Sequence, residues 1–279
     1  MGMAANSWQW VDQLAPAVTD AMSDMIAPLE SMFTFHYPED GQGIDAVLVP
    51  SATGTLSMTS ITPGTISGSG DDSDYSFSGT TITPAPYAVK IPLAEEHLRK
   101  AQPSQVQGVI NAMAEAGYDQ LITLIETAVA ALTVLTGGTS GAALTADLFK
   151  TAKWKLRAAK ASGPLYSVLT IPAFEDLEVS LETAAAPLGS VGQDAVNGVD
   201  MFRYSGVQIY PDAYLGNDGT DGYSFISTKD GLHVAWGLEP TFKILPTTDP
   251  VNVRLAMKMW VAVGTPNPNK ILWLKSKKD

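Results

Sequence analysis

Residues 104–135 read SQVQGVINAMAEAGYDQLITLIETAVAALTVL, and no other part of the chain constrains the architecture as strongly. Apolar residues recur there at spacings of three and four, which places one apolar stripe along one face of a helix. Ser104 follows Pro103 and can cap the first turn, while Gly137 and Gly138 supply backbone freedom of the kind found where helices end. At about 1.5 Å per residue the helix would be roughly 48 Å long. The sequence thus predicts a long amphipathic helix as the central element.

Composition limits what can be built around this helix. The chain has 279 residues, 17 basic and 29 acidic, for a net charge of -12, and it has no cysteine. The length allows one large domain or two smaller ones. The charge argues against a dominant basic surface for nucleic acid, so any contact with nucleic acid should be loose. Without cysteine there are no disulfides and no cysteine-ligated zinc. No apolar run reaches the ~18 residues of a membrane span, and we expect neither a signal peptide nor a membrane contact.

The segment 7–35 has a helix-like apolar pattern that contains Trp8 and Trp10 and is interrupted by Pro16 and Pro28. Tryptophan and methionine side chains adapt to irregular surfaces. Two interpretations stay open: the segment docks on the body of its own chain, or it reaches onto a neighbouring copy.

The segment 51–86 is dominated by small polar residues, because 21 of its 36 residues are Ser, Thr or Gly. Short alternating runs on either side of the sequence GSGDDSD predict two extended arms with a turn between them. A two-stranded ribbon is marginal in water, so a partner or the parent domain should cover it. A disordered Ser/Thr linker is the alternative.

Beyond the long helix, Thr145 should cap a second helix that ends near residue 161. One face of it carries Lys150, Lys153, Arg157 and Lys160, for which a solvated helix face is the expected explanation. A buried strand is predicted at 165–171, then a short helix, then several strands between 199 and 245. Apolar residues at every second position of 251–263 predict a strand with one buried face.

Motifs for chemistry are missing. The sequence lacks a nucleophile elbow, a phosphate-binding loop and a zinc-protease motif. His36, His97 and His233 are too far apart in sequence to suggest a metal site, and the acidic runs at 71–74 and 217–221 lack the spacing of a calcium loop. We expect no catalytic residue, no metal and no cofactor, and hence a protein that is not an enzyme.

The order of these parts resembles the major capsid proteins of tailed bacteriophages with the Hong Kong 97-like fold. The most specific stretches are GYSFISTKDGLHVAWGLEPTFKIL at 222–245 and VNVRLAMKMWVAVGTPNPNKILWL at 251–274. Softer matches are PLYSVLTIPAFEDLEVSL at 164–181 and VDMFRYSGVQIYPDAYL at 199–215. The resemblance covers nearly the whole chain.

The resemblance implies an α+β fold with an N-terminal arm at 1–36 and an extended β-hairpin loop at 37–89. A peripheral domain with a long spine helix would comprise 90–135 and 246–279, and an axial domain would comprise 136–245. It further implies hexamers and pentamers that form an icosahedral shell around double-stranded DNA. Only some 36 residues precede the loop, so a separate scaffolding protein is expected besides a portal. The chain would be assembled in the host cytoplasm and located in the virion.

Two other functions stay open at this stage. An encapsulin-type cellular shell shares the fold and encloses enzymes. A secreted β-rich carbohydrate-binding protein or hydrolase would suit the Ser/Thr/Gly content.

Inter-subunit contacts are predicted for apolar residues of the arm and for apolar and acidic residues of the loop: Trp8, Trp10, Met58, Ile61, Asp71, Asp72, Asp74, Tyr75 and Phe77. Gly108 and Gly117, inside the long helix, should let it bend or let a neighbour pack closely. Some relatives fuse subunits through an isopeptide bond between a loop lysine and an asparagine. No lysine lies between residues 37 and 89, so such a bond is not expected here.

Overall fold

The computed structural model describes residues 9–38, 46–53, 76–94, 103–183, 202–245 and 252–278. The helices of these ranges are α1 (Gln9–Met32), α3 (Pro103–Ala130), α4 (Ala146–Ala158), α5 (Ile171–Thr183) and the short 3-10 helix η2 (Pro268–Lys270). The strands are β1 (Thr34–His36), β2 (Val47–Thr53), β3 (Ser76–Ile82), β4 (Ala85–Ala94), β5 (Thr136–Gly138), β6 (Leu165–Thr170), β7 (Phe202–Tyr204), β8 (Val207–Asp212), β9 (Phe225–Thr228), β10 (His233–Leu245), β11 (Asn252–Gly264) and β12 (Ile271–Lys275).

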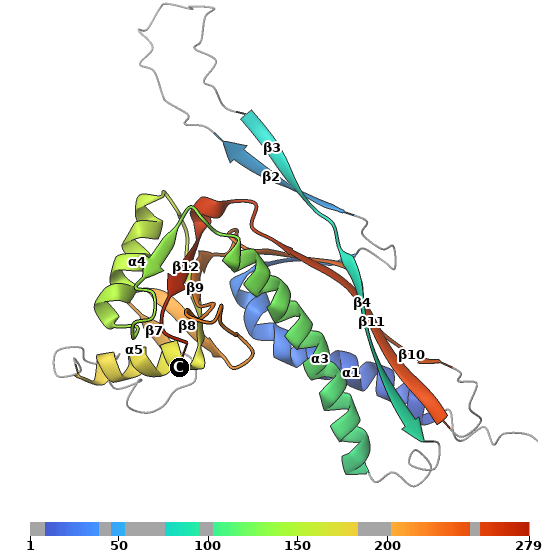
Figure 1. The fold of residues 1–279 in the computed structure, drawn as a ribbon. Coiled ribbons are helices and arrows are strands. Elements are labelled where there is room, and N and C mark those ends of the chain that lie inside the picture. Colours follow the sequence, from blue (N-terminus) through green and yellow to red (C-terminus); the bar gives the residue numbers. More distant parts are fainter. Residues whose placement is uncertain are drawn as a thin grey trace, which may run out of the picture.

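Two lobes are built on two different sheets (Figure 1). The four-stranded lobe has the strand order β1-β10-β11-β4 and is covered by α1 and α3. The six-stranded lobe has the order β5-β12-β9-β6-β8-β7 and carries α4 and α5. A third unit, the β2–β3 ribbon, projects beyond the four-stranded lobe (Figure 1).

The predicted long helix is present as α3, but it ends at Ala130 and not at Leu135. Leu132 is buried and the carbonyl of Leu135 accepts a hydrogen bond from Trp273 N, so these residues are apolar because they pack in the core beyond the helix. Gly137 and Gly138 do not cap the helix. They form β5, which pairs with β12 in parallel. None of the described helices is long and apolar enough to cross a membrane.

The apolar N-terminal segment folds as α1, a single helix that continues through Pro16 and Pro28. The buried side chains of α1 and of the next residue, Phe33, contact α3 and the sheet of the same chain; those of α1 are Val18, Met22, Ile26, Leu29 and Met32. For residues 17–33 the structure therefore decides between the two open interpretations in favour of docking on the chain's own body.

Strand β11 lies between β10 and β4 and runs antiparallel to both. Its side chains alternate as predicted, since Leu255, Met257 and Met259 are buried while Arg254 and Lys258 are exposed. The odd-numbered face packs on the two helices. The even-numbered face, which we call the outward face of the sheet, points away from them.

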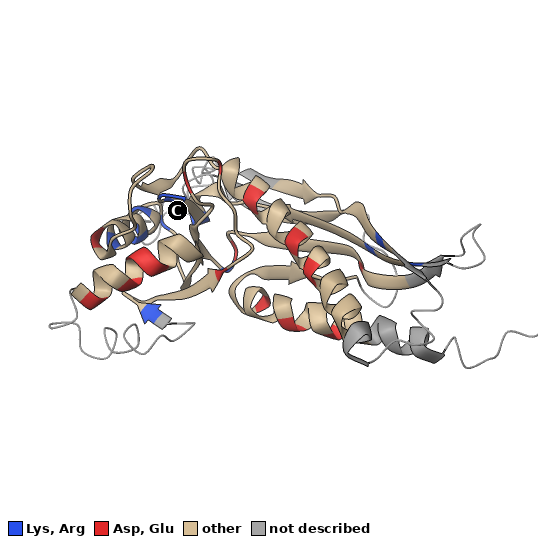
Figure 2. Cartoon of the chain, turned by 60° about the horizontal axis from the view of Figure 1, so that its bottom comes forward, with Lys and Arg blue, Asp and Glu red and all other residues tan. Residues whose placement is uncertain are grey.

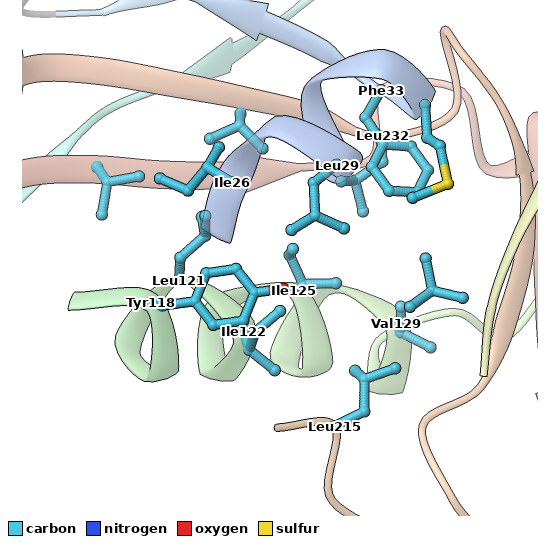
Figure 3. Close-up of a cluster of buried hydrophobic side chains, with 14 of the residues drawn as sticks. Ile26, Leu29, Phe33, Tyr118, Leu121, Ile122, Ile125, Val129, Leu215 and Leu232 are labelled. Carbon is cyan, nitrogen blue, oxygen red and sulfur yellow. The ribbon is translucent and has the colours of Figure 1, made fainter. Parts of the chain in front are cut away.

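The main hydrophobic core joins the two lobes. Its residues come from α1, α3, β10 and β11, and also from β6, β9 and β12 of the other sheet. Figure 3 shows the part where Ile26 and Leu29 of α1 face Leu121 and Ile125 of α3, with Phe33, just after α1, beside Leu232. A second core fills the six-stranded lobe beneath α4 and α5.

Local signals in the six-stranded lobe act as predicted. Thr145 caps α4 by accepting a hydrogen bond from Leu148 N at its Oγ1. The next buried strand, β6, leads directly into α5.

The division between the lobes differs from the expected domain boundaries at two strands. Residues 233–245 were expected in the axial domain, but β10 pairs with β11 in the four-stranded sheet. Residues 271–275 were expected in the peripheral domain, but β12 pairs with β5 and β9 in the six-stranded sheet. The chain changes sheets in the turn after Thr228 and again at 265–270. Strand pairing is a long-range choice that the alternation of a single strand does not encode.

The ribbon pairs Val47 with Ile82 at its base and Thr53 with Ser76 at its far end. This antiparallel pairing confirms extended arms at 51–53 and 76–82 within the predicted segment, and the first arm begins earlier than predicted, at Val47. The runs at 55–59 and the turn GSGDDSD, which the sequence predicts farther out, lie outside the described residues.

Candidate assembly surfaces

The base of the ribbon lies on the outward face of the four-stranded sheet. Val49 and Ile82 form a small cluster with Ala235 of β10, and Ala262 of β11 packs against it. The opposite face of this base lacks cover within the described residues, because Leu48, which lies between Val47 and Val49 in β2, is 68% exposed. A two-stranded ribbon is marginal in water without a further layer, so its uncovered face favours a partner.

Most residues predicted to make inter-subunit contacts are not placed. Trp8, Met58, Ile61, Asp71, Asp72, Asp74 and Tyr75 lie outside the described residues. Trp10 lies in α1 and Phe77 lies in β3 opposite Ala52, but their side chains are not among those described. Their contacts therefore stay predictions.

The two glycines of α3 have different surroundings. A Cβ at Gly117 would lie 2.9 Å from Met22 Sδ of α1 and 2.9 Å from Met257 Cε of β11. Gly117 therefore permits a close approach within the same chain. A Cβ at Gly108 would meet nothing within 4 Å.

A group of cations on the outward face of the sheet was not identified from the sequence. Lys90 of β4 and Arg254 and Lys258 of β11 are exposed, and we call these three residues the cationic sheet face. Figure 2 shows the contrast with Asp and Glu along α1 and α3, on the other side of the same lobe. The alternation of β11 predicts that Arg254 and Lys258 share a face. That Lys90 lies beside them follows only from the register between β4 and β11, which the sequence does not show.

The basic stripe of α4 is largely used inside its own lobe. Lys153 Nζ donates to Ser205 Oγ at 3.1 Å and also to the Ser205 carbonyl. The guanidinium of Arg157 donates to the carbonyls of Ala161 and Gly163, each at 2.7 Å. Lys150 Nζ lies 5.6 Å from the ring centroid of Tyr204. The expectation of a solvated face is wrong for Lys153 and Arg157, whereas the side chain of Lys150 is 44% exposed and Lys160 is exposed.

A buried carboxylate links the lobes. Tyr118 of α3 donates its hydroxyl to Asp212 Oδ2 at 2.5 Å, and Tyr214 N donates to Asp212 Oδ1 at 2.8 Å. Burial raises the pKa of Asp212, and burial together with the Asp212 charge raises the pKa of Tyr118. Close by, Gly216 N donates to the carboxylate of Glu126. The loop after β8 is thereby held against α3. Residues 94 positions apart give no local signal of this contact.

Two of the histidines meet although they lie 197 positions apart in the sequence. His36 Nε2 lies 2.9 Å from His233 Nδ1, across the parallel β1–β10 pair. Burial lowers the pKa of both imidazoles, and the charge of His36 lowers that of His233 further.

The carboxylates of the acidic loop at 217–221 accept hydrogen bonds from groups of the same chain. Asp221 accepts from Ser140 Oγ and Gly141 N, and backbone N–H groups lower the pKa of Asp218. Within the described residues no group of three or more His, Asp or Glu could hold a metal ion. The acidic run at 71–74 lies outside them.

Comparisons with known proteins give the fold. No protein-family model and no curated protein matches the sequence. Among solved structures, the capsid of cyanophage Pam1 has a TM-score of 0.64 at 12% identity, covering 88% of each chain. A protein of Mycobacterium phage Bobi has 0.63 at 15% identity, covering 90% of each. The SrpI encapsulin of Synechococcus elongatus has 0.63 at 10% identity, covering 89% of this chain and 87% of that one.

These likenesses extend over nearly the whole chain at very low identity, and they include phage proteins and an encapsulin. The α+β capsid fold expected from the sequence is confirmed.

Proposed function

We propose that the chain is a structural shell protein, the major capsid protein of a tailed bacteriophage. Its copies would gather as hexamers and pentamers into an icosahedral head around double-stranded DNA. The observation that carries this proposal is the projecting β2–β3 ribbon, with Leu48 exposed, on a fold shared with phage capsid proteins.

The energetic reason is the lack of cover on the ribbon. Two strands alone bury too little apolar surface to be stable in water, so they need a third layer. Within the described residues only the base of the ribbon touches the parent sheet, through Val49 and Ile82. A neighbouring copy would supply the missing cover along the rest, with Met58, Ile61, Tyr75 and Phe77 as the proposed apolar contacts.

In such a shell the four-stranded lobe would be the peripheral domain and the six-stranded lobe the axial domain. The acidic helices of Figure 2 support only loose contact with packaged DNA, because like charges repel. A separate scaffolding protein and a portal complete the proposed partners. Assembly would take place in the host cytoplasm and the product would be the virion.

An encapsulin-type shell is a second candidate, because the SrpI encapsulin matches as well as the phage proteins do, with a TM-score of 0.63. The third candidate, a secreted β-rich carbohydrate-binding protein or hydrolase, would be expected to have a β-sandwich or β-barrel fold. The described residues instead place the long helices α1 and α3 in one layer against a sheet, which does not favour it.

The test is electron microscopy of the expressed full-length chain, with light scattering across protein and crowding-agent concentration. Closed shells or rings of five and six copies are expected. A folded protein that stays a 29.5 kDa monomer under all conditions would refute the proposal. Particles from the natural source then separate the two candidates: nuclease-protected double-stranded DNA indicates a virus, and enclosed enzyme without DNA indicates an encapsulin.

A further inference from the structure

The His36–His233 pair borders the base of the ribbon. His36 pairs with Ala235, which belongs to the cluster on which the ribbon base packs. His233 pairs with Gly264 of β11, and a Cβ at Gly264 would lie 2.7 Å from Ile82 Cδ1 at the end of β3. Residues paired across a ladder point to the same face of a sheet. Both imidazoles therefore share the outward face with the base of the ribbon.

Strand β1, which carries His36, is held by few contacts. It has three residues and pairs on one side only, with β10. Its first residue, Thr34, donates its hydroxyl to the carbonyl of Lys229 at 3.0 Å. The preceding residue, Phe33, is buried in the main core and anchors the end of α1. A short edge strand of this kind can separate from its neighbour while the helix before it stays docked.

The contact between the two rings depends on their protonation. Only 2.9 Å separates His36 Nε2 from His233 Nδ1, so one nitrogen must donate a hydrogen and the other must accept it. When both rings are charged, every ring nitrogen carries a hydrogen, and two donors and two positive charges then face each other. His233 is 7% exposed, and its Nε2 makes no hydrogen bond within the described part of the chain. Its charged form is therefore poorly stabilised.

The charged groups beside His233 do not offset this repulsion. Asp230, in the turn before β10, raises the pKa of His233 through its backbone and its charge, but burial and the charge of His36 lower it more strongly. The Asp230 carboxylate is already paired with Lys270 of η2, with Nζ and Oδ2 3.2 Å apart, and Lys270 also lowers the pKa of His233. Among the described residues no carboxylate oxygen lies within 4 Å of either imidazole.

The acidic groups on the far side of β1 act on Tyr37 instead. Its hydroxyl donates to the carboxylate of Glu30 in α1. The charges of Glu30 and Glu239, together with burial, raise the pKa of this phenol. Tyr37 stays neutral throughout the range in which the imidazoles titrate, so it does not contribute to their response.

We propose that the His36–His233 pair is an acid-sensitive switch, which holds β1 and the base of the ribbon on the four-stranded sheet at neutral pH and releases both when the two imidazoles are charged. A single proton can be shared between the facing nitrogens, so release requires both rings to be charged. Because the folded-state pKa of each ring lies below 6.5, the closed state is complete above that pH, and release grows as the pH falls through the folded-state values. The switch lies within one copy and does not depend on the proposed shell function.

Hydrogen exchange of the full-length chain tests the switch locally. Protection factors, which correct for the intrinsic pH dependence of exchange, should fall about 10-fold or more at 34–37 and at 79–82 between pH 7.5 and 5. Residues 255–259 of β11 should keep their protection, because β11 lies between two strands.

Matched variants separate the pair from general effects of acid. His36→Gln and His233→Gln each remove one of the two charges, so each should abolish the acid-induced loss of protection. His97→Gln removes the third and last histidine of the chain and should behave as the wild type does. Circular dichroism at pH 7.5 checks folding, and either variant of the pair is sufficient if the other does not fold.

The possible results are distinct. An equal loss at 34–37 and 255–259 would mean global unfolding and would overturn the proposal. Full protection of 34–37 at pH 5, or a loss that persists in both glutamine variants of the pair, would overturn it as well. If 34–37 opens and 79–82 does not, the pair controls β1 alone and release of the ribbon is refuted. None of these results bears on whether the chain forms shells.

Discussion

The imidazole rings of His36 and His233 stack with centroids 5.2 Å apart, and the nitrogens that face each other are 2.9 Å apart. One ring must donate a hydrogen and the other must accept it, so the contact requires at least one neutral imidazole. It joins β1, which follows α1 directly, to the first residue of β10. Asp230 and Lys270 are the other charged groups whose fields reach His233.

This pair predicts that stability falls in mild acid. The pKa of each imidazole is lower in the folded state than the ordinary value of 6.5, because burial disfavours the charged form. The unfolded chain then binds more protons than the folded one below that value, so the stabilisation is complete above pH 6.5 and is lost as the pH falls through the folded-state pKa. Melting curves between pH 7.5 and 5 should show this loss. His36→Gln, whose amide does not titrate, should show a smaller loss, and an identical pH dependence would contradict the assignment.

The two glycines of α3 should respond differently to alanine. Gly108→Ala should raise the free energy of unfolding by about 0.5–1 kcal/mol, because alanine favours the helix and meets no neighbour. Gly117→Ala should lose that gain, because Met22 and Met257 must shift to admit the methyl group, and overpacking costs about 1 kcal/mol or more. Denaturant titration of both variants measures the difference. Equal stabilisation would show that the close approach at Gly117 is unimportant, and altered particles with unchanged stability would support a role in bending.

The buried Tyr118–Asp212 bond should be costly to remove. Tyr118→Phe leaves the carboxylate without its side-chain donor, which should lower the free energy of unfolding by about 1–3 kcal/mol. Loss of this donor should also raise the pKa of Asp212 further, since the hydrogen bond opposes the effect of burial. Tyr166→Phe, on the neighbouring strand β6, is the control and should have little effect. A similar loss in both variants would mean that general packing, and not the buried bond, holds the junction.

Assembled particles should contain no covalent links between copies. No lysine lies between residues 37 and 89, and Lys90 is held at the outward face of β4 in the four-stranded sheet. Its side chain reaches only ~6 Å from the backbone, so it cannot substitute for an amine on the ribbon. Boiled in detergent, particles should give one band near 29.5 kDa. A ladder of multimers in reducing detergent would contradict this prediction.

Features with a local sequence signal could be predicted, and features that depend on long-range pairing could not. The helix α3, the cap at Thr145 and the alternation of β11 follow from residues within a few positions of one another. The sheet membership of β10 and β12 does not, because every alternating strand can pair in more than one place. The contact between His36 and His233 arises from that pairing, as does the cationic sheet face. The helix was predicted to continue past Ala130 because Leu132, a buried core residue beyond its end, happens to keep the apolar spacing of the helix.

The shared core has a mechanical consequence. Phe33, which directly follows α1, and Phe225 of β9 lie with ring centroids 5.7 Å apart, inside one cluster that contains residues of both sheets. Close-packed interiors transmit strain and do not shear easily. Each copy should therefore act as one stiff plate. The curvature of a closed shell built from such rigid copies would then be set at the interfaces between copies. The angle between neighbouring copies would differ between rings of five and rings of six, while each copy keeps the same shape.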